Sequence, residues 1–256
     1  QTTRVVEFND LDAMEAALKQ GDVACILLEP AMTNVGIVLP ETGYHVALRD
    51  LATKYGALLI IDETHTISAG PGGMTERDRL KPDLLTIGKS IGGGIPTGAF
   101  GMSEDVANRI ARLVRRDWID TGGIGGTLAG NALSLAAMRS TLTQVMTKEN
   151  FARMIPLGDR WSDGVDSVIK SCDLPWHCNR LGARGEYNFS AKAPRTGAEA
   201  AAAGDFAIEQ YLHLKLLNDG FLLTPFHNMA LISPDTTKAD VDAHTEALMA
   251  TCKELS

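Results

Sequence analysis

Two apolar runs in the first third of the sequence each end close to a residue that could carry chemistry. Residues 58–61 are followed by Asp62, and residues 84–87 are followed, one position later, by Lys89. Short apolar runs bounded by turn residues are typical of buried parallel strands, and open α/β sheets bind ligands at the carboxyl ends of such strands. Pyridoxal phosphate (PLP) requires this pair of groups, because its aldehyde forms a Schiff base with a lysine while an acid pairs with its pyridinium nitrogen. Asp62 and Lys89 therefore predict a PLP site.

Other ligand-binding patterns that share these residues fail on spacing. A Walker A phosphate loop requires a glycine where Asp83 stands, and a G-x-G-x-x-G pattern that starts at Gly92 has Thr97 in place of its third glycine. Residues 62–65 (DETH) could supply metal ligands, but neither an HExxH motif nor a second histidine cluster accompanies them. We therefore expect neither a nucleotide phosphate loop nor a metal site.

Composition and charge exclude several classes of function. The chain has 256 residues, of which 45% are hydrophobic and 22% charged, as in ordinary globular proteins. The net charge of −8 argues against a nucleic-acid surface, and no apolar run approaches the ~20 residues that cross a bilayer. The first residues lack a signal-peptide pattern, and the four cysteines show neither metal nor disulfide spacing. We expect a cytoplasmic protein with no nucleic-acid or membrane partner.

Expected strands and helices alternate through the first part of the chain. Strands are expected at 23–28, 58–61, 84–87 and 97–102, and helices at 10–20, 41–55, 103–113 and 128–146. This alternation predicts an α/β fold with a mostly parallel sheet. The pattern changes near residues 145–155, and the rest of the chain predicts a smaller α+β unit. Its expected helices run to about 170, over 198–220 and from 236, and its expected strands lie near 185–191, 221–224 and 229–233.

Four segments of the sequence resemble class III aminotransferases, a PLP-dependent family of fold type I that includes glutamate-1-semialdehyde 2,1-aminomutase and ω-transaminases. The matching segments are LLEPAMTNVGIVLP (27–40), GALLIIDETHT (56–66), PDLLTIGKSIGGGIPTGAFG (82–101) and GGTLAGNALSLAA (125–137). The resemblance implies that residues 1–150 are the second half of a PLP-binding large domain and that residues 151–256 are the small C-terminal α+β domain.

The resemblance assigns roles to three residues that face the cofactor ring. Lys89 would be the Schiff-base lysine and would later move the substrate proton, Asp62 would pair with the pyridine nitrogen, and Asn34 would hydrogen-bond the ring hydroxyl. Taken in isolation, Lys89 would be an ordinary solvated lysine and Asp62 would cap a turn.

Three further positions follow from the same resemblance. Gly126 and Thr127 match the place where a backbone amide and a hydroxyl reach the cofactor phosphate of the neighbouring subunit, which implies a homodimer with shared sites. The simpler interpretation of Thr127 is an N-cap of the helix expected from residue 128, and helix N-termini also attract anions. Thr64 stands where the family usually has Val or Ile packed on one face of the ring.

The resemblance implies an aminotransferase that moves an amino group between an amine or amino acid and a 2-oxo acid or aldehyde by ping-pong chemistry. An aminomutase or epimerase on the same scaffold is an alternative, because the same lysine and aspartate serve both reactions. A non-catalytic partner subunit is a further alternative, because the Gly-Ser/Thr-rich phosphate cup and the ring-stacking aromatic residue of the family's first half do not precede Gln1. We expect the chain to be the C-terminal portion of a longer enzyme. Arg180, Arg184 and Arg195 are candidates for binding a substrate carboxylate.

Overall fold

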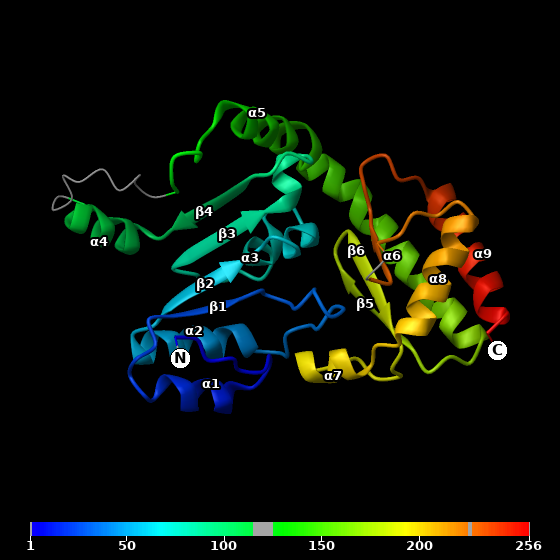
Figure 1. Cartoon of the computed structure of the whole chain (residues 1–256), viewed down its shortest axis with the longest axis horizontal. Coiled ribbons are helices and arrows are strands. Elements are labelled where there is room, and N and C mark those ends of the chain that lie inside the picture. Colours follow the sequence, from blue (N-terminus) through cyan, green and yellow to red (C-terminus); the bar gives the residue numbers. More distant parts are fainter. Residues whose placement is uncertain (1, 115–124, 225–226, 256) are drawn as a thin grey trace.

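The chain folds around two separate sheets, each with its own helices. The structure, a computed structural model, describes residues 2–114, 125–224 and 227–255. The first sheet has the order β1 (Cys25–Leu28), β2 (Leu58–Asp62), β3 (Leu84–Gly88) and β4 (Gly98–Met102). The second has the order β5 (His177–Leu181), β6 (Arg184–Asn188) and β7 (Met229–Leu231). Figure 1 shows the first sheet on the left and the second on the right, with α5 (Ala132–Ser140) above them and α7 (Gly197–Ala202) below.

The first sheet is mostly parallel, as the alternation of elements predicts. Strands β1, β2 and β3 run parallel, and β4 is antiparallel to β3 at the edge. Helices α1 (Leu11–Leu18) and α2 (Tyr44–Tyr55) lie beneath β1 in Figure 1. Their apolar faces and the strands form one core cluster that includes Leu18, Ile26, Leu48, Leu59 and Ile61. The α/β fold class with a mostly parallel sheet is confirmed.

Two helices in the first part of the chain begin at side-chain caps, and one of these caps differs from the expected residue. Asp10 caps α1 by accepting the N–H of Ala13 at 2.8 Å. The helix expected from residue 128 begins instead at Ala132, because Gly130 lies at φ +70° and Asn131 caps the helix by accepting the N–H of Ser134 at 3.0 Å. The prediction that Thr127 caps this helix is therefore wrong. The helix continues through a π-helical segment, Thr141–Val145.

The C-terminal elements surround an aromatic core. Helices α6 (Lys148–Ser171), α8 (Phe206–Asn218) and α9 (Lys238–Lys253) share a core cluster with the second sheet around Trp161, Trp176 and Tyr187. The helix expected at 198–220 is two helices, α7 and α8, because Asp205 starts a new helix by accepting the N–H groups of residues 207 and 208. Residues 221–224 form no strand, and β5 is a strand that the sequence patterns did not predict.

The two groups of elements meet through the turn between β5 and β6. Gly182 lies at φ +62° in this turn, and a Cβ atom there would lie 2.6 Å from the backbone of Ala69, so only glycine allows the approach. Ala183 donates its N–H to the carbonyl of Ser68 at 2.9 Å. The turn therefore fixes β6 beside the segment that follows β2. The short elements on this side are η1 (Thr66–Ala69), α3 (Gly73–Arg77) and η2 (Lys89–Gly92), while α4 (Glu104–Val114) follows β4.

No helix within residues 2–114, 125–224 and 227–255 is both long and apolar enough to cross a membrane.

Candidate active site

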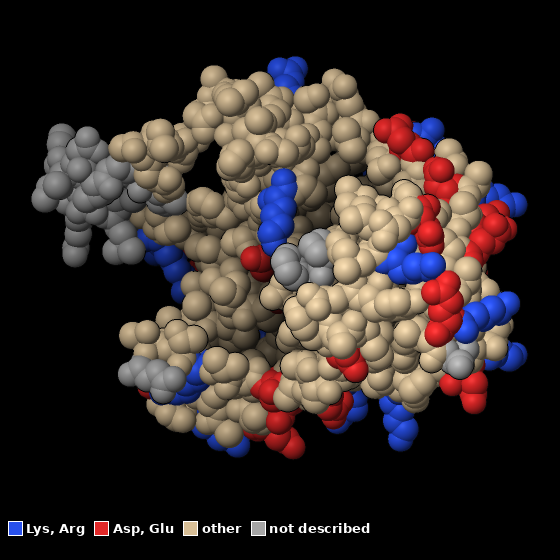
Figure 2. Space-filling model, turned by 45° about the vertical axis from the view of Figure 1, so that its right-hand side comes forward, with Lys and Arg blue, Asp and Glu red and all other residues tan. Residues whose placement is uncertain are grey.

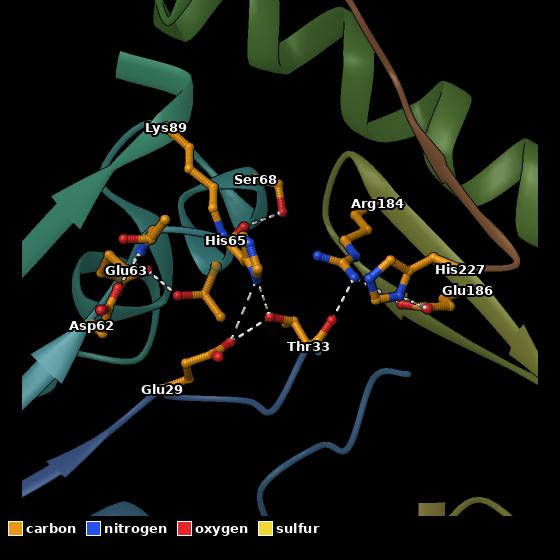
Figure 3. A network of polar contacts seen from close by, with 12 residues as sticks. Glu29, Thr33, Asp62, Glu63, His65, Ser68, Lys89, Arg184, Glu186 and His227 are labelled. Carbon is orange, nitrogen blue, oxygen red and sulfur yellow. Dashed lines mark hydrogen bonds and ion pairs between the residues drawn. The ribbon is translucent and has the colours of Figure 1, made fainter. Parts of the chain in front are cut away.

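Asp62 and Lys89 lie at the same end of the first sheet. This sheet edge is formed by the carboxyl ends of the parallel strands. The register of the parallel strands β2 and β3 pairs Asp62 with Thr86, and Lys89 follows Thr86 by three residues. Figure 3 shows the Lys89 side chain pointing toward His65, with Asp62 at the end of β2 beside them. Lys89 has a φ of +46°, a left-handed backbone conformation that residues other than glycine adopt rarely and that often marks functional sites.

Asp62 caps a turn and still keeps one carboxylate oxygen available. Its Oδ1 accepts the N–H of Thr64 at 2.8 Å, so the turn-capping interpretation holds. Its Oδ2 accepts no hydrogen bond from any residue that the structure describes. This free oxygen and the exposed amine of Lys89 at one sheet edge fit PLP, which needs an acceptor for its pyridinium N–H and a lysine for its aldehyde.

The other predicted site residues are distributed unequally around this edge. Thr64 is partly buried, and a Cβ on Gly88 would lie 3.7 Å from its Oγ1, so Thr64 lies against the end of β3. Asn34 is exposed in the loop after β1 and makes no side-chain hydrogen bond within the described ranges. Gly126 and Thr127 are exposed in the turn before α5, and no hydrogen bond between described residues joins them to the sheet edge.

A series of polar contacts, which the sequence patterns did not predict, leads from Lys89 to Glu29. The Nζ of Lys89 lies 2.5 Å from the Nε2 of His65, and the Nδ1 of His65 lies 2.7 Å from the Oγ1 of Thr33. Thr33 donates in turn to the carboxylate of Glu29, which follows β1 (Figure 3). In the sequence, His65 stands out only as part of a possible set of metal ligands, residues 62–65. The available signal was the position of Glu29, at a strand end like Asp62 and Lys89.

A second group of charged side chains reaches the same loop from the C-terminal elements. Arg184 donates from Nη2 to the carbonyl of Thr33 at 2.9 Å and to the Oε2 of Glu186 at 2.8 Å. The Nδ1 of His227 lies 2.8 Å from the Oε1 of Glu186. Figure 2 shows the molecule hollowed between its two groups of elements, with a basic side chain extending across the hollow.

Of the three arginines considered for a substrate carboxylate, Arg184 alone lies at this network. Arg180 is paired with Asp163 and Asp166, and Arg195 is paired with Glu41. Arg184 is only 4% exposed, and its Nε has no hydrogen-bond partner among the described residues.

Burial sets the protonation of the histidine that contacts Lys89. Desolvation lowers the pKa of His65, and the positive charge of Lys89 lowers it further, so the imidazole is neutral at neutral pH. Desolvation raises the pKa of Glu29, while the hydrogen bond from Thr33 acts in the opposite direction. In the described part of the chain, no three or more His, Cys, Asp and Glu side chains are arranged to hold a metal ion.

Comparison with known proteins relates this chain to one family. The family model described as "Aminotransferase class-III" matches residues 2–251. A curated relative from Opitutus terrae, named glutamate-1-semialdehyde 2,1-aminomutase, is 34% identical over 260 residues that cover 100% of this chain and 59% of the relative.

Two solved structures extend the comparison. A glutamate-1-semialdehyde aminomutase from Pseudomonas aeruginosa, solved in complex with PMP, superposes with a TM-score of 0.96 at 50% identity, covering 99% of this chain and 57% of that one. An ω-transaminase from Sphaerobacter thermophilus superposes with a TM-score of 0.81 at 26% identity, covering 96% and 56%. The chain thus spans less than three fifths of the length of these relatives.

Proposed function

We propose that this chain, which belongs to the class-III aminotransferase family of PLP-dependent proteins, is the lysine-bearing part of an enzyme that moves an amino group. The observation that carries the proposal is the juxtaposition of Asp62 and Lys89 at the ends of neighbouring parallel strands. Each offers the atom that the cofactor needs: a carboxylate oxygen without a partner among the described residues and a primary amine.

The reaction that we propose is an isomerisation of one small amino aldehyde, as the name glutamate-1-semialdehyde 2,1-aminomutase implies for the relatives. The family resemblance of the sequence implies transfer of the amino group between separate molecules, with an aminomutase as the alternative. The relatives at 34% and 50% identity both carry the aminomutase name and favour that alternative. Transfer between separate molecules stays the second candidate, because an ω-transaminase at 26% identity shares the fold.

The residues of the chain would divide the work as follows. Bound at Lys89, PLP supplies an electron sink for the substrate carbon that carries the amine. The Nζ of Lys89 would hold the proton removed from that carbon and return it, and the Oδ2 of Asp62 would accept a hydrogen bond from the ring nitrogen. Asn34 would contact the ring hydroxyl, and Thr64 would face the ring.

The complete enzyme is proposed to be longer than this chain and to be a homodimer. Residues 1–150 would be the second half of the large domain, and residues 151–256 the small domain. The amide of Gly126 and the hydroxyl of Thr127 would hold the cofactor phosphate of the partner subunit. Exposed apolar side chains next to Thr127 support a subunit contact there: Leu128 is 81%, Leu133 65% and Leu135 50% exposed.

The test compares the two reactions in the full-length enzyme. Glutamate 1-semialdehyde is supplied as the isomerisation substrate, and an amine donor with a 2-oxo acid acceptor is supplied separately. We expect isomerisation without stoichiometric amination of the acceptor, and neither reaction in Lys89→Ala. Amination of the acceptor without isomerisation would establish the aminotransferase instead. Absence of both reactions and of covalently bound cofactor in the wild type would identify a non-catalytic subunit.

A further inference from the structure

We propose that His65 is the base that accepts a proton from the Nζ of Lys89, and that Thr33 and Glu29 orient the imidazole for this task. The inference rests on the proposed function, because Lys89 must be a neutral amine before it can attack a carbonyl carbon. The contact that carries it is the 2.5 Å separation between Lys89 Nζ and His65 Nε2. Two nitrogen atoms this close are in hydrogen-bond contact, so a proton can pass directly from one to the other.

The hydrogen bonds of Thr33 fix the tautomer of His65. A threonine hydroxyl has one proton to donate, and Thr33 donates it to the carboxylate of Glu29. At the contact with His65, Thr33 must therefore accept, so the Nδ1 of His65 carries the proton at 2.7 Å from Oγ1. In the neutral ring, Nε2 is then the acceptor, and its lone pair is directed at Lys89. The network thus presents the basic nitrogen to the amine.

The surroundings of His65 contain charges of both signs. Glu29 and Asp62 face it from the ends of β1 and β2, and Lys89 faces it from η2. Arg184 from β6 adds positive charge on the other side, where His227 from the segment before β7 also faces the ring. Desolvation and the neighbouring positive charges lower the pKa of His65, so its ring is neutral and the lone pair of Nε2 is available to accept a proton.

The proposed step is a single proton transfer. The N–H bond at Lys89 Nζ breaks, its electron pair stays on the amine, and a new N–H bond forms at His65 Nε2. The positive charge then resides on the imidazolium, whose Nδ1 lies 3.9 Å from the Oε2 of Glu29. The carboxylate stabilises this charge, and the Thr33 hydroxyl between them holds the ring plane.

The backbones of Thr33 and His65 are each held by a further hydrogen bond. The buried Arg184 holds the carbonyl of Thr33, and the hydroxyl of Ser68 donates to the carbonyl of His65 at 2.9 Å. These contacts fix the backbones of the residues that present the hydroxyl and the imidazole. The geometry therefore does not depend on the contact with Lys89 itself.

The experiment measures covalent capture of PLP by the full-length enzyme freed of cofactor. The capture rate is followed by visible absorbance from pH ~5 to ~9, a range that includes the ordinary histidine pKa. The wild-type rate should fall below an inflection on the acid side of 6.5, because burial lowers the pKa of His65. In His65→Gln the rate at neutral pH should fall about 100-fold, as for loss of a general base, and the inflection should vanish.

Conservative variants separate orientation from packing. Thr33→Val keeps the shape of the side chain but removes the hydroxyl, and we expect the rate at neutral pH to fall about tenfold. Thr33→Ser restores the hydroxyl and should restore the rate. His177→Gln is the matched control, because this half-buried histidine of β5 contacts the carbonyl of Ser190 at 2.6 Å, outside the network, and its replacement should change neither rate nor inflection.

The outcomes distinguish the two proposals. Wild-type rate and pH profile in His65→Gln would overturn this inference while leaving the proposed function intact. Equal rates in Thr33→Val and Thr33→Ser would remove the orienting role, and this pair also decides the question if His65→Gln does not fold. Covalent capture that persists in Lys89→Ala would overturn the proposed function itself.

Discussion

His65 at the edge of the parallel sheet and His244 in α9 are both buried enough to have a lowered pKa, yet their settings differ. His65 contacts a polar partner through each ring nitrogen, and one of these partners is Lys89. His244 accepts a hydrogen bond from Trp161 at 3.1 Å, and its Nε2 has no hydrogen-bond partner among the described residues. Desolvation alone lowers the pKa of His244 to about 4. Burial thus makes both rings neutral, but the partners decide whether a ring can take part in proton transfer.

Two adjacent acids at the end of β2 show the same contrast. Glu63 is 1% exposed, and its carboxylate accepts hydrogen bonds from Thr66, Met74 and Thr75, including both the N–H and the hydroxyl of Thr75. Asp62 accepts one bond and is partly exposed. Saturated hydrogen bonding identifies Glu63 as structural, whereas the free oxygen of Asp62 remains available for a ligand.

The largest effect is expected from Asp62→Asn. An amide cannot supply the negative charge that keeps a pyridine nitrogen protonated, so kcat of the full-length enzyme should fall up to about 10³-fold, the effect of losing one strong electrostatic contact. Asp50→Asn on the exposed face of α2 is the control and should leave kcat unchanged. An unchanged kcat in Asp62→Asn would contradict the conclusion that Asp62, unlike Glu63, is available for a ligand.

The next largest effect is a loss of stability at acid pH caused by His244 in the C-terminal core. The folded pKa of His244 is about 4 against an ordinary value of 6.5, so the unfolded chain binds this proton at a higher pH than the folded one. The free energy of unfolding should fall by about 3 kcal/mol as the pH drops from 6.5 to 4 through this residue, with no contribution above that window.

His244→Gln keeps an acceptor for Trp161 and removes the titrating ring, so urea unfolding at several pH values should show a shallower acid dependence. The pKa of His65 is also lowered, but this residue is less buried. His65→Gln should therefore reduce the acid dependence of the free energy of unfolding less than His244→Gln does. An acid dependence that is the same in wild type and His244→Gln would contradict this prediction.

Glu63→Gln should destabilise the fold without a primary effect on cofactor chemistry. Replacing the carboxylate by an amide places an NH₂ group against donors from Thr66 or Thr75, and the loss should be about 2–3 kcal/mol in urea unfolding. Asp62→Asn should cost less than about 1 kcal/mol in the same measurement. Equal losses at the two positions would show that both acids are structural.

A small effect is expected at the start of α9. Thr237 and Asp240 form a reciprocal capping box, in which each side chain bonds the backbone of the other. Thr237→Ala should lower the free energy of unfolding by about 1 kcal/mol, and Thr237→Ser should restore it. A loss in Thr237→Ala that exceeds the loss in Glu63→Gln would reverse the ranking of the two regions.

The sequence was sufficient for features that depend on local pattern. The apolar runs before Asp62 and Lys89 are strands β2 and β3, and their parallel pairing follows from the alternation of elements. The start of α5 was misplaced because Thr127 and Asn131 are both good N-caps, and only the positive φ of Gly130 between them decides.

The polar network could not be predicted from local pattern. Thr33 and His65 are 32 positions apart, and their contact depends on how the loops after β1 and β2 fold over the sheet edge. Arg184 lies 151 positions from Thr33 and reaches it only because the turn at Gly182 brings β6 beside the first sheet. Such contacts depend on tertiary packing, which periodicity along the chain does not encode.

The most direct test of the account is to locate the covalent cofactor in the full-length enzyme. Borohydride reduction fixes PLP to the amine that holds it, and peptide mass analysis identifies that residue. We predict that the label is on Lys89 alone and that the visible absorbance disappears on reduction. A label on any other lysine, or no covalent label at all, would contradict the assignment of Lys89 at the carboxyl edge of the sheet.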